Sequence, residues 1–202
     1  MNAYITDIST PFGRALSCFL KEKEWHIYST NDRDEDIDHI DILIVTDDVT
    51  SQEDTFSVCG PINTEIMMEQ VEKNDIVPIK IIERLLSKLE NGAMKRICAI
   101  ACAPRVSISH TPKSDGYGYA LSKIAFLQSL RFLFNLLRPE GYTFRLFDPM
   151  QSPEEETIPL EIAAKTAASY FISARGGDPY DLSRSDENRY CLRDALGREW
   201  PW

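Results

Sequence analysis

Short apolar runs alternate along the chain with amphipathic segments of helical length. Continuous apolar runs predict strands, and segments whose apolar positions recur every three or four residues predict helices. The run ILIVT at 42–46 is typical of a strand buried on both faces of a parallel sheet. We expect strands at 3–8, 25–29, 42–46, 96–102, 143–147 and 190–193, and helices at 12–23, 62–73, 77–89, 117–137 and 158–174.

This order of elements is typical of α/β proteins. It predicts a doubly wound, Rossmann-type fold with a largely parallel sheet, formed by one domain over residues 1–202. The polar, acidic segment 31–41 has room for only one helical turn, so we expect the fold to be shortened after the second strand. The segment 104–118 is interpreted as a loop.

The helix at 117–137 begins with a tyrosine and a lysine that share one face. Tyr119 and Lys123 are four residues apart, which places their side chains one turn apart. A phenol beside an ammonium is a plausible proton-transfer pair, because the positive charge favours phenolate and lowers a pKa that starts at about 10. The chain has eight tyrosines, so this spacing can also arise by accident and form a plain surface contact.

Composition narrows the classes of partner. With 43% hydrophobic and 27% charged residues, the sequence is typical of a soluble globular protein, and we expect no membrane-spanning segment. The net charge of −10 argues against nucleic acid and anionic membranes as partners. The three histidines lack ligand spacing, so we expect no metal site. Five cysteines without a CxxC pair, interpreted as buried, favour the reducing cytoplasm.

Several motifs resemble the short-chain dehydrogenase/reductase family, across nearly the whole length. Residues 5–16 align with its TGxxxGxG cofactor loop, and DILIVTDD at 41–48 aligns with its strand-end pattern DILINNAG. Asn74 stands where the family's active-site asparagine is expected, and residues 119–123 match YxxSK, with Ser122 as the serine. The ending GREWPW is similar to the GxxxPW ending of compact single-domain carbonyl reductases.

The resemblance implies roles for the matching residues. Tyr119 would be the general acid or base that exchanges a proton with a carbonyl oxygen as hydride moves to or from a nicotinamide. Lys123 would lower the pKa of Tyr119 and hold the nicotinamide ribose, while Asn74 would hold a water that relays protons. The cofactor, NAD or NADP, would contact Thr6, Phe12, Gly13, Thr46 and Lys123.

The serine that fixes the substrate oxygen in this family has several candidate positions here. The family pattern places it at Val106, whereas strand register points to Cys102, a poor hydrogen-bond donor. Ser107 and Ser109 are close enough to substitute if the loop is remodelled, and Ser107 is the candidate that we carry forward as a catalytic residue.

Three features weaken the implied dinucleotide site. Asp7 and Pro11 replace loop glycines, which brings a carboxylate towards the phosphates and removes a backbone donor. Asp47 and Asp48 replace the end of the NNAG pattern and add like charges at the rim of the adenosine side. The short segment 31–41 omits the helix and strand that wall the adenine pocket.

Two main functions therefore stay open. One is a divergent family member with weak or lost NAD(P) binding that acts as a non-catalytic subunit of a homodimer or of a hetero-oligomer with a related chain. Its contacts would come from the helices at 77–89 and 119–137, because the second has more apolar surface than one sheet face can cover. The alternative is an active NAD(P)H-dependent oxidoreductase that interconverts a carbonyl and an alcohol with Tyr119. A third hypothesis is a neutral or cationic ligand in the same cleft, which the acids would favour.

Overall fold

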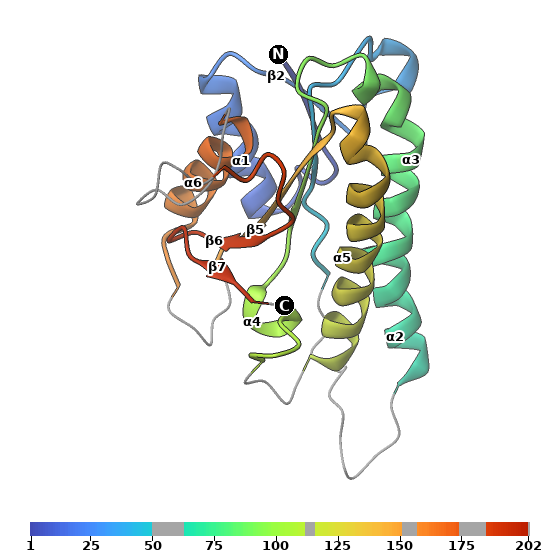
Figure 1. Cartoon of the computed structure of the whole chain (residues 1–202), viewed down its shortest axis with the longest axis vertical. Coiled ribbons are helices and arrows are strands. Elements are labelled where there is room, and N and C mark those ends of the chain that lie inside the picture. Colours follow the sequence, from blue (N-terminus) through green and yellow to red (C-terminus); the bar gives the residue numbers. More distant parts are fainter. Residues whose placement is uncertain (50–62, 112–115, 151–156, 174–184, 202) are drawn as a thin grey trace.

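One mostly parallel sheet with helices on both faces forms the protein, and the predicted doubly wound fold is confirmed (Figure 1). The computed structural model describes residues 1–49, 63–111, 116–150, 157–173 and 185–201. Within these residues the strand order is β2-β1-β3-β4-β5-β6-β7, and only the β6–β7 pair is antiparallel. The strands are β1 (Asn2–Ile5), β2 (His26–Ser29), β3 (Ile42–Val45), β4 (Arg96–Ile100), β5 (Thr143–Asp148), β6 (Leu192–Asp194) and β7 (Glu199–Trp200).

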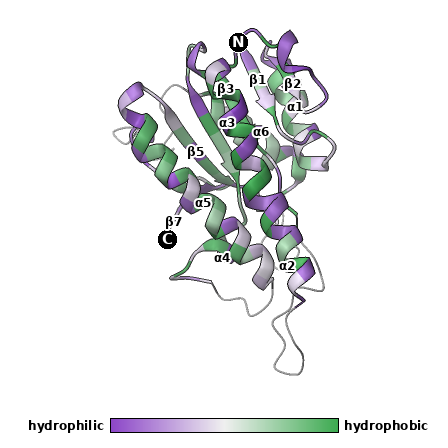
Figure 2. Cartoon of the chain, turned by 90° about the vertical axis from the view of Figure 1, so that its right-hand side faces the viewer, coloured by the Kyte–Doolittle hydropathy of each residue, from purple (hydrophilic) through white to green (hydrophobic). Residues whose placement is uncertain are grey.

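Two layers of helices bury the two faces of the sheet. α1 and α6 cover one face, and α2, α3 and α5 cover the other (Figure 1). Apolar residues are concentrated in the central strands and recur along α5 (Figure 2). The helices are α1 (Pro11–Glu22), α2 (Thr64–Val71), α3 (Val77–Glu90), α4 (Ala103–Val106), α5 (Tyr117–Leu137) and α6 (Leu160–Ile172), with single turns η1 (Asp34–Asp36), η2 (Glu72–Ile76) and η3 (Arg138–Glu140).

The start of α1 is built as the sequence predicts. Thr10 caps the helix, its Oγ1 accepting the Gly13 N–H at 3.1 Å, and Pro11 stands in the first turn. A Cβ on Gly13 would lie 2.0 Å from the backbone oxygen of Asp7, so only glycine lets the helix approach the turn this closely. The segment 31–41 contains only η1, which confirms that the fold is shortened after β2.

Other expectations were wrong. The segment 104–118 is not all loop, because α4 occupies Ala103–Val106. A helix of one turn has too few positions to show a hydrophobic period, so no pattern predicted it. The chain end adds the two-residue strand β7, which is also too short to alternate. Cys18 is exposed, although Cys98 and Cys191 are buried as expected. Cys59 and the acidic run 154–156 lie outside the described residues.

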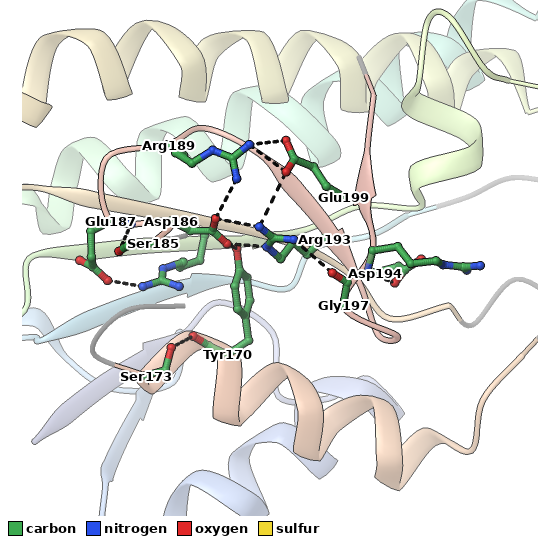
Figure 3. Close-up of polar contacts among 12 residues, drawn as sticks. Tyr170, Ser173, Ser185, Asp186, Glu187, Arg189, Arg193, Asp194, Gly197 and Glu199 are labelled. Carbon is green, nitrogen blue, oxygen red and sulfur yellow. Dashed lines mark hydrogen bonds and ion pairs between the residues drawn. The ribbon is translucent and has the colours of Figure 1, made fainter. Parts of the chain in front are cut away.

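A buried ion-pair network fastens β6 to the rest of the sheet (Figure 3). The Asp186 carboxylate accepts hydrogen bonds from Arg193 Nε at 2.5 Å and Nη2 at 2.9 Å, and from the Tyr170 hydroxyl at 3.1 Å. Burial alone would raise the pKa of Asp186, but the hydrogen bonds and charge of Arg193 outweigh it and hold the pKa below its usual value. The network therefore ties α6 to the last parallel strand.

A second carboxylate in this network bridges two buried arginines. Glu187 Oε1 accepts from Arg96 Nη2 at 2.7 Å and from Arg145 Nη2. Arg96 also donates to the last carbonyls of α6, at Phe171 and Ser173. A cation at the C-terminus of a helix is favourable because of the helix dipole. One half-buried glutamate thus holds the ends of β4, β5 and α6 together.

The helix α5 also satisfies a membrane-span test. Together with η3, over Tyr117–Glu140, it is long and apolar enough to cross a membrane by length and composition, alone among the described helices. Nevertheless, its buried side packs into the apolar core over the sheet, through Phe126, Leu127, Leu130, Phe134 and Leu137. The helix thus covers one face of the sheet.

Candidate active site

The candidate active site lies at the carboxyl edge of the sheet. The strand order reverses between β1 and β3, and open α/β sheets bind ligands outside the carboxyl ends of their strands at such a point. Thr6 follows β1, residues 46–48 follow β3 and Cys102 follows β4, so the parallel strands deliver them to one edge. The first turns of α5 bring Tyr119 and Lys123 to the same edge, where both are buried.

The hydroxyl of Tyr119 is held between two groups of the protein. It donates to Asp48 Oδ1 at 2.8 Å and accepts the backbone N–H of Cys102 at 3.0 Å. The side chain is only 1% exposed. The atom that would exchange a proton with a carbonyl therefore already has a carboxylate as its acceptor.

Lys123 is bound by the same strand end. Its ammonium donates to the backbone oxygen of Asp47 and lies 3.5 Å from Asp48 Oδ1. The side chain is fully buried and also lies over the Phe126 ring, 5.4 Å from its centroid. Asp48 thus contacts both members of the tyrosine–lysine pair, and its side chain is the partly exposed one of the three.

The electrostatics of Tyr119 are opposite to the prediction. Burial raises its pKa well above the usual value, and the negative charge of Asp48 raises it further, while the Cys102 N–H lowers it less. Lys123 is not among the main causes that set this pKa, so its predicted effect on Tyr119 stays a prediction. The ammonium is paired with acceptors of the β3 end, and a carboxylate beside the phenol stabilises its protonated form.

Asn74 is brought to the site by a distorted turn. It lies in the π-helical turn η2 between α2 and α3, and it is fully buried. Pro78 has no N–H for the Asn74 carbonyl four residues earlier, and its ring crowds that carbonyl, which favours a wider turn. The Asn74 amide donates to the Val49 carbonyl at 2.8 Å and to Ser122 Oγ at 3.0 Å, while its oxygen accepts the Val49 N–H at 2.8 Å.

Ser107 is turned to another part of the chain. Its hydroxyl donates to the backbone oxygen of Pro201 at 2.6 Å, and the residue is buried. The structure instead brings the backbone N–H of Cys102 to Tyr119, so Ser107 joins α4 to the C-terminal segment.

The predicted cofactor contacts on the first and third strands serve the fold. Thr6 Oγ1 accepts the Thr46 N–H at 2.9 Å, and Thr46 Oγ1 bonds both the N–H and the C=O of Asp7, at 3.0 and 2.9 Å. Phe12, in the first turn of α1, is buried in the core between this helix and the sheet. Gly13 is required for close packing of α1 against the turn, as shown above. These residues lie at the expected edge, but their polar groups are committed to each other.

The residues present do not fit a dinucleotide in this arrangement. The Asp7 carboxylate occupies the turn before α1, where it accepts the Ser9 N–H at 2.7 Å and the Ser9 hydroxyl at 2.6 Å. Pyrophosphate binds such turns through free backbone N–H groups at a helix N-terminus, and a carboxylate there repels it. In addition, the ammonium of Lys123, which is expected to hold the nicotinamide ribose, is paired with the Asp48 carboxylate.

Asp47 also disfavours the binding of a phosphate group at this edge of the sheet. One of its oxygens, Oδ2, is buried and accepts no hydrogen bond from the described residues. Burial raises the pKa of this carboxyl, while a hydrogen bond from Thr6 and the charge of Lys123 lower the pKa by less. A buried, incompletely bonded carboxylate disfavours another anion beside it. Within the described residues, no cluster of side chains could hold a metal ion.

Comparison with known proteins shows the fold. The carbonyl reductase Sniffer of D. melanogaster superposes with a TM-score of 0.75 at 13% identity, over 100% of this chain and 99% of that one. A carbonyl reductase from Pseudomonas aeruginosa PAO1 in complex with NADP gives 0.69 at 15% identity, with the same coverage. No protein-family model and no curated protein sequence matches the chain. The chain therefore has the short-chain dehydrogenase/reductase fold over its whole length.

Sequence reasoning missed the contacts that Asp48 makes in the site. We expected Asp48 at the adenosine side, as a repulsive charge, whereas the structure places it on Tyr119 and Lys123. The available signal was the replacement of the small residues of NNAG by aspartates. Because Asp48 and Tyr119 are 71 positions apart, no spacing rule could pair them.

Proposed function

We propose that this protein is a non-catalytic subunit with the carbonyl reductase fold, in which NAD(P) binding is weak or lost. One observation carries the proposal: the Asp48 carboxylate bonds the Tyr119 hydroxyl at 2.8 Å and lies 3.5 Å from the Lys123 ammonium. A general acid needs a proton available for the substrate, and the proton of Tyr119 is donated to a carboxylate of the chain itself. The raised pKa of Tyr119 also disfavours its use as a base.

Titration of the purified full chain with NADH and NADPH tests this proposal. Nicotinamide fluorescence and calorimetry should detect no binding at micromolar cofactor. Asp7 would repel the phosphates, and Asp48 already forms an ion pair with Lys123. The variant Asp48→Gly restores the glycine of the NNAG pattern and removes the carboxylate that contacts Tyr119 and Lys123. We expect binding to appear first in the double variant Asp7→Gly/Asp48→Gly.

The matched control is Asp36→Gly, which removes an exposed acid of η1 and the same formal charge as Asp48→Gly. It should leave cofactor binding as weak as in the wild type. Micromolar binding of either nucleotide by the wild-type chain would overturn the proposal. It would mean that Asp48 moves aside readily and that the pair is available for chemistry.

The role as a subunit rests on the outer face of α5. Phe132 is 66% exposed and Leu136 is 69% exposed, and they lie one helical turn apart. Leu133, in contrast, packs partly against the core. α3 lies beside α5 on the same face of the sheet (Figure 1), so the two helices offer one continuous surface. We propose that this surface joins the chain to a second copy or to a related subunit.

Charge substitutions distinguish this interface from ordinary surface. Phe132→Glu and Leu136→Glu should convert an oligomer to a monomer in sedimentation analysis, because a buried unpaired carboxylate is costly. Ile162→Glu is the control, since Ile162 is 54% exposed but lies on α6, on the other face of the sheet. A wild-type chain that is monomeric at working concentration and captures no related subunit would refute the subunit role.

An active carbonyl–alcohol oxidoreductase stays the second candidate. The observation in its favour is that the structure gathers Tyr119, Ser122, Lys123 and Asn74 into one buried cluster. Its test is reduction of a panel of carbonyl compounds with NADPH. Turnover by the wild type that disappears in Tyr119→Phe, with the fold intact by circular dichroism, would establish this candidate over the first.

A further inference from the structure

A cleft separate from the Tyr119 cluster runs along α5. Its volume is about 400 Å³. α5 contributes Ile124, Leu127, Gln128 and Arg131, whose spacing of three, four and seven residues places them on one stripe of the helix. None of the residues that line it belongs to the cluster around Tyr119. The cleft is therefore a different site from the one discussed above.

Most of the residues that line this cleft are apolar. Besides the residues of α5, the lining includes Val106 from α4, Ile108 from the loop behind it, and Tyr190, ahead of β6. The Tyr190 hydroxyl donates to the backbone oxygen of Leu127, which fixes the tyrosine ring against α5. Ile108 is 73% exposed at the rim. Preformed apolar clefts of about 300–1,000 Å³ with few polar groups are typical sites for small molecules.

Among the described residues that line the cleft, Arg131 is the one with a charge. Its guanidinium carbon lies 5.2 Å from the ring centroids of both Tyr190 and Phe134. Stacking on aromatic rings uses the flat face of the guanidinium and leaves the N–H donors at its edge for an acceptor. Among the described residues, no carboxylate forms an ion pair with Arg131 and no oxygen accepts a hydrogen bond from it.

The geometry points to a binding site for a small monocarboxylate with an apolar body, of the medium-chain fatty acid class. The carboxylate would meet the guanidinium of Arg131, whose planar fork matches two carboxylate oxygens. The apolar chain would lie against Val106, Ile124 and Leu127 and cover Ile108 at the rim. An alcohol would lose the charged contact, and an amine would be repelled by the positive charge.

Calorimetric titration of the full chain with decanoate, decanol and decylamine tests the site. We expect decanoate to bind, decanol to bind at least about tenfold more weakly because a charge-assisted hydrogen bond is lost, and decylamine not to bind. Arg131→Gln should weaken decanoate binding by at least about tenfold for the same reason. Ile108→Asp, at the exposed rim, should also weaken it, because it replaces an apolar contact by a like charge.

Arg138→Gln is the matched control. Arg138 lies over the same Phe134 ring, at 5.5 Å, but does not line the cleft, so the variant should bind decanoate as the wild type does. Equal affinity for decanoate and decanol, or unchanged affinity in Arg131→Gln, would overturn the carboxylate site. Absence of decanoate binding would overturn it as well. The titrations contain no nucleotide, so their result is independent of the proposed function.

Discussion

Removal of the Asp48 carboxylate should weaken the fold. In Asp48→Ala, Tyr119 loses the acceptor of its 2.8 Å hydrogen bond and Lys123 loses a carboxylate at 3.5 Å. A hydrogen bond to a charged group contributes about 1.5–3 kcal/mol. The Asp48 side chain is 31% exposed, so solvent screens the ion pair and we add less than about 1 kcal/mol for it. The expected decrease in the free energy of unfolding is about 2 kcal/mol.

Urea denaturation followed by circular dichroism measures this change. With a slope of about 2 kcal/mol per molar urea, the midpoint should fall by about 1 M. Asp48→Asn keeps an oxygen acceptor for Tyr119 and loses only the charge, so it should fall less. Asp36→Ala removes an exposed carboxylate and should change stability by less than about 0.5 kcal/mol.

An unchanged or higher midpoint in Asp48→Ala would refute this reasoning. That result would mean that the stabilisation from the contacts of Asp48 with Tyr119 and Lys123 is no larger than the electrostatic repulsion of Asp48 by Asp7 and Asp47. Asp48 would then be a replaceable occupant of a ligand site, and the oxidoreductase candidate would gain support.

Three further predictions follow from the buried charges. The pKa of Tyr119 is raised above the usual tyrosine value of about 10. Wild type and Tyr119→Phe should therefore differ in phenolate absorbance only at a pH well above that value. The hydrogen bonds and charge of Arg193 lower the pKa of Asp186. The contribution of Asp186 to the free energy of unfolding is therefore complete above about pH 4 and is lost as the pH falls through the folded-state pKa. Stability measured against pH in Asp186→Asn should lack this acid loss. Glu187→Ala leaves the buried Arg96 and Arg145 without their carboxylate and should reduce the free energy of unfolding by about 3–5 kcal/mol in urea denaturation.

Local spacing was sufficient for the main elements. The helix at 117–137 has the predicted bounds, and the Thr10 cap and the short connection after β2 follow from residue types within a few positions of each other. Periodicity reports how one element meets its core, so it can be read without knowing what lies opposite. The one-turn helix α4 and the two-residue strand β7 are too short to show such a period, so they were not predicted.

Pattern and spacing along the chain were enough to predict the sheet, the layers of helices, and the position of Tyr119 and Lys123 on one helical turn at the edge of the sheet. The contacts of these side chains follow from the way the elements pack together. Asp48 reaches Tyr119 because β3 ends and α5 begins at the same edge of the sheet, and Glu187 reaches Arg96 across 91 positions because packing brings their elements together. The charge state of a buried group depends on such neighbours, and their positions are set by the packing of whole elements rather than by distance along the chain.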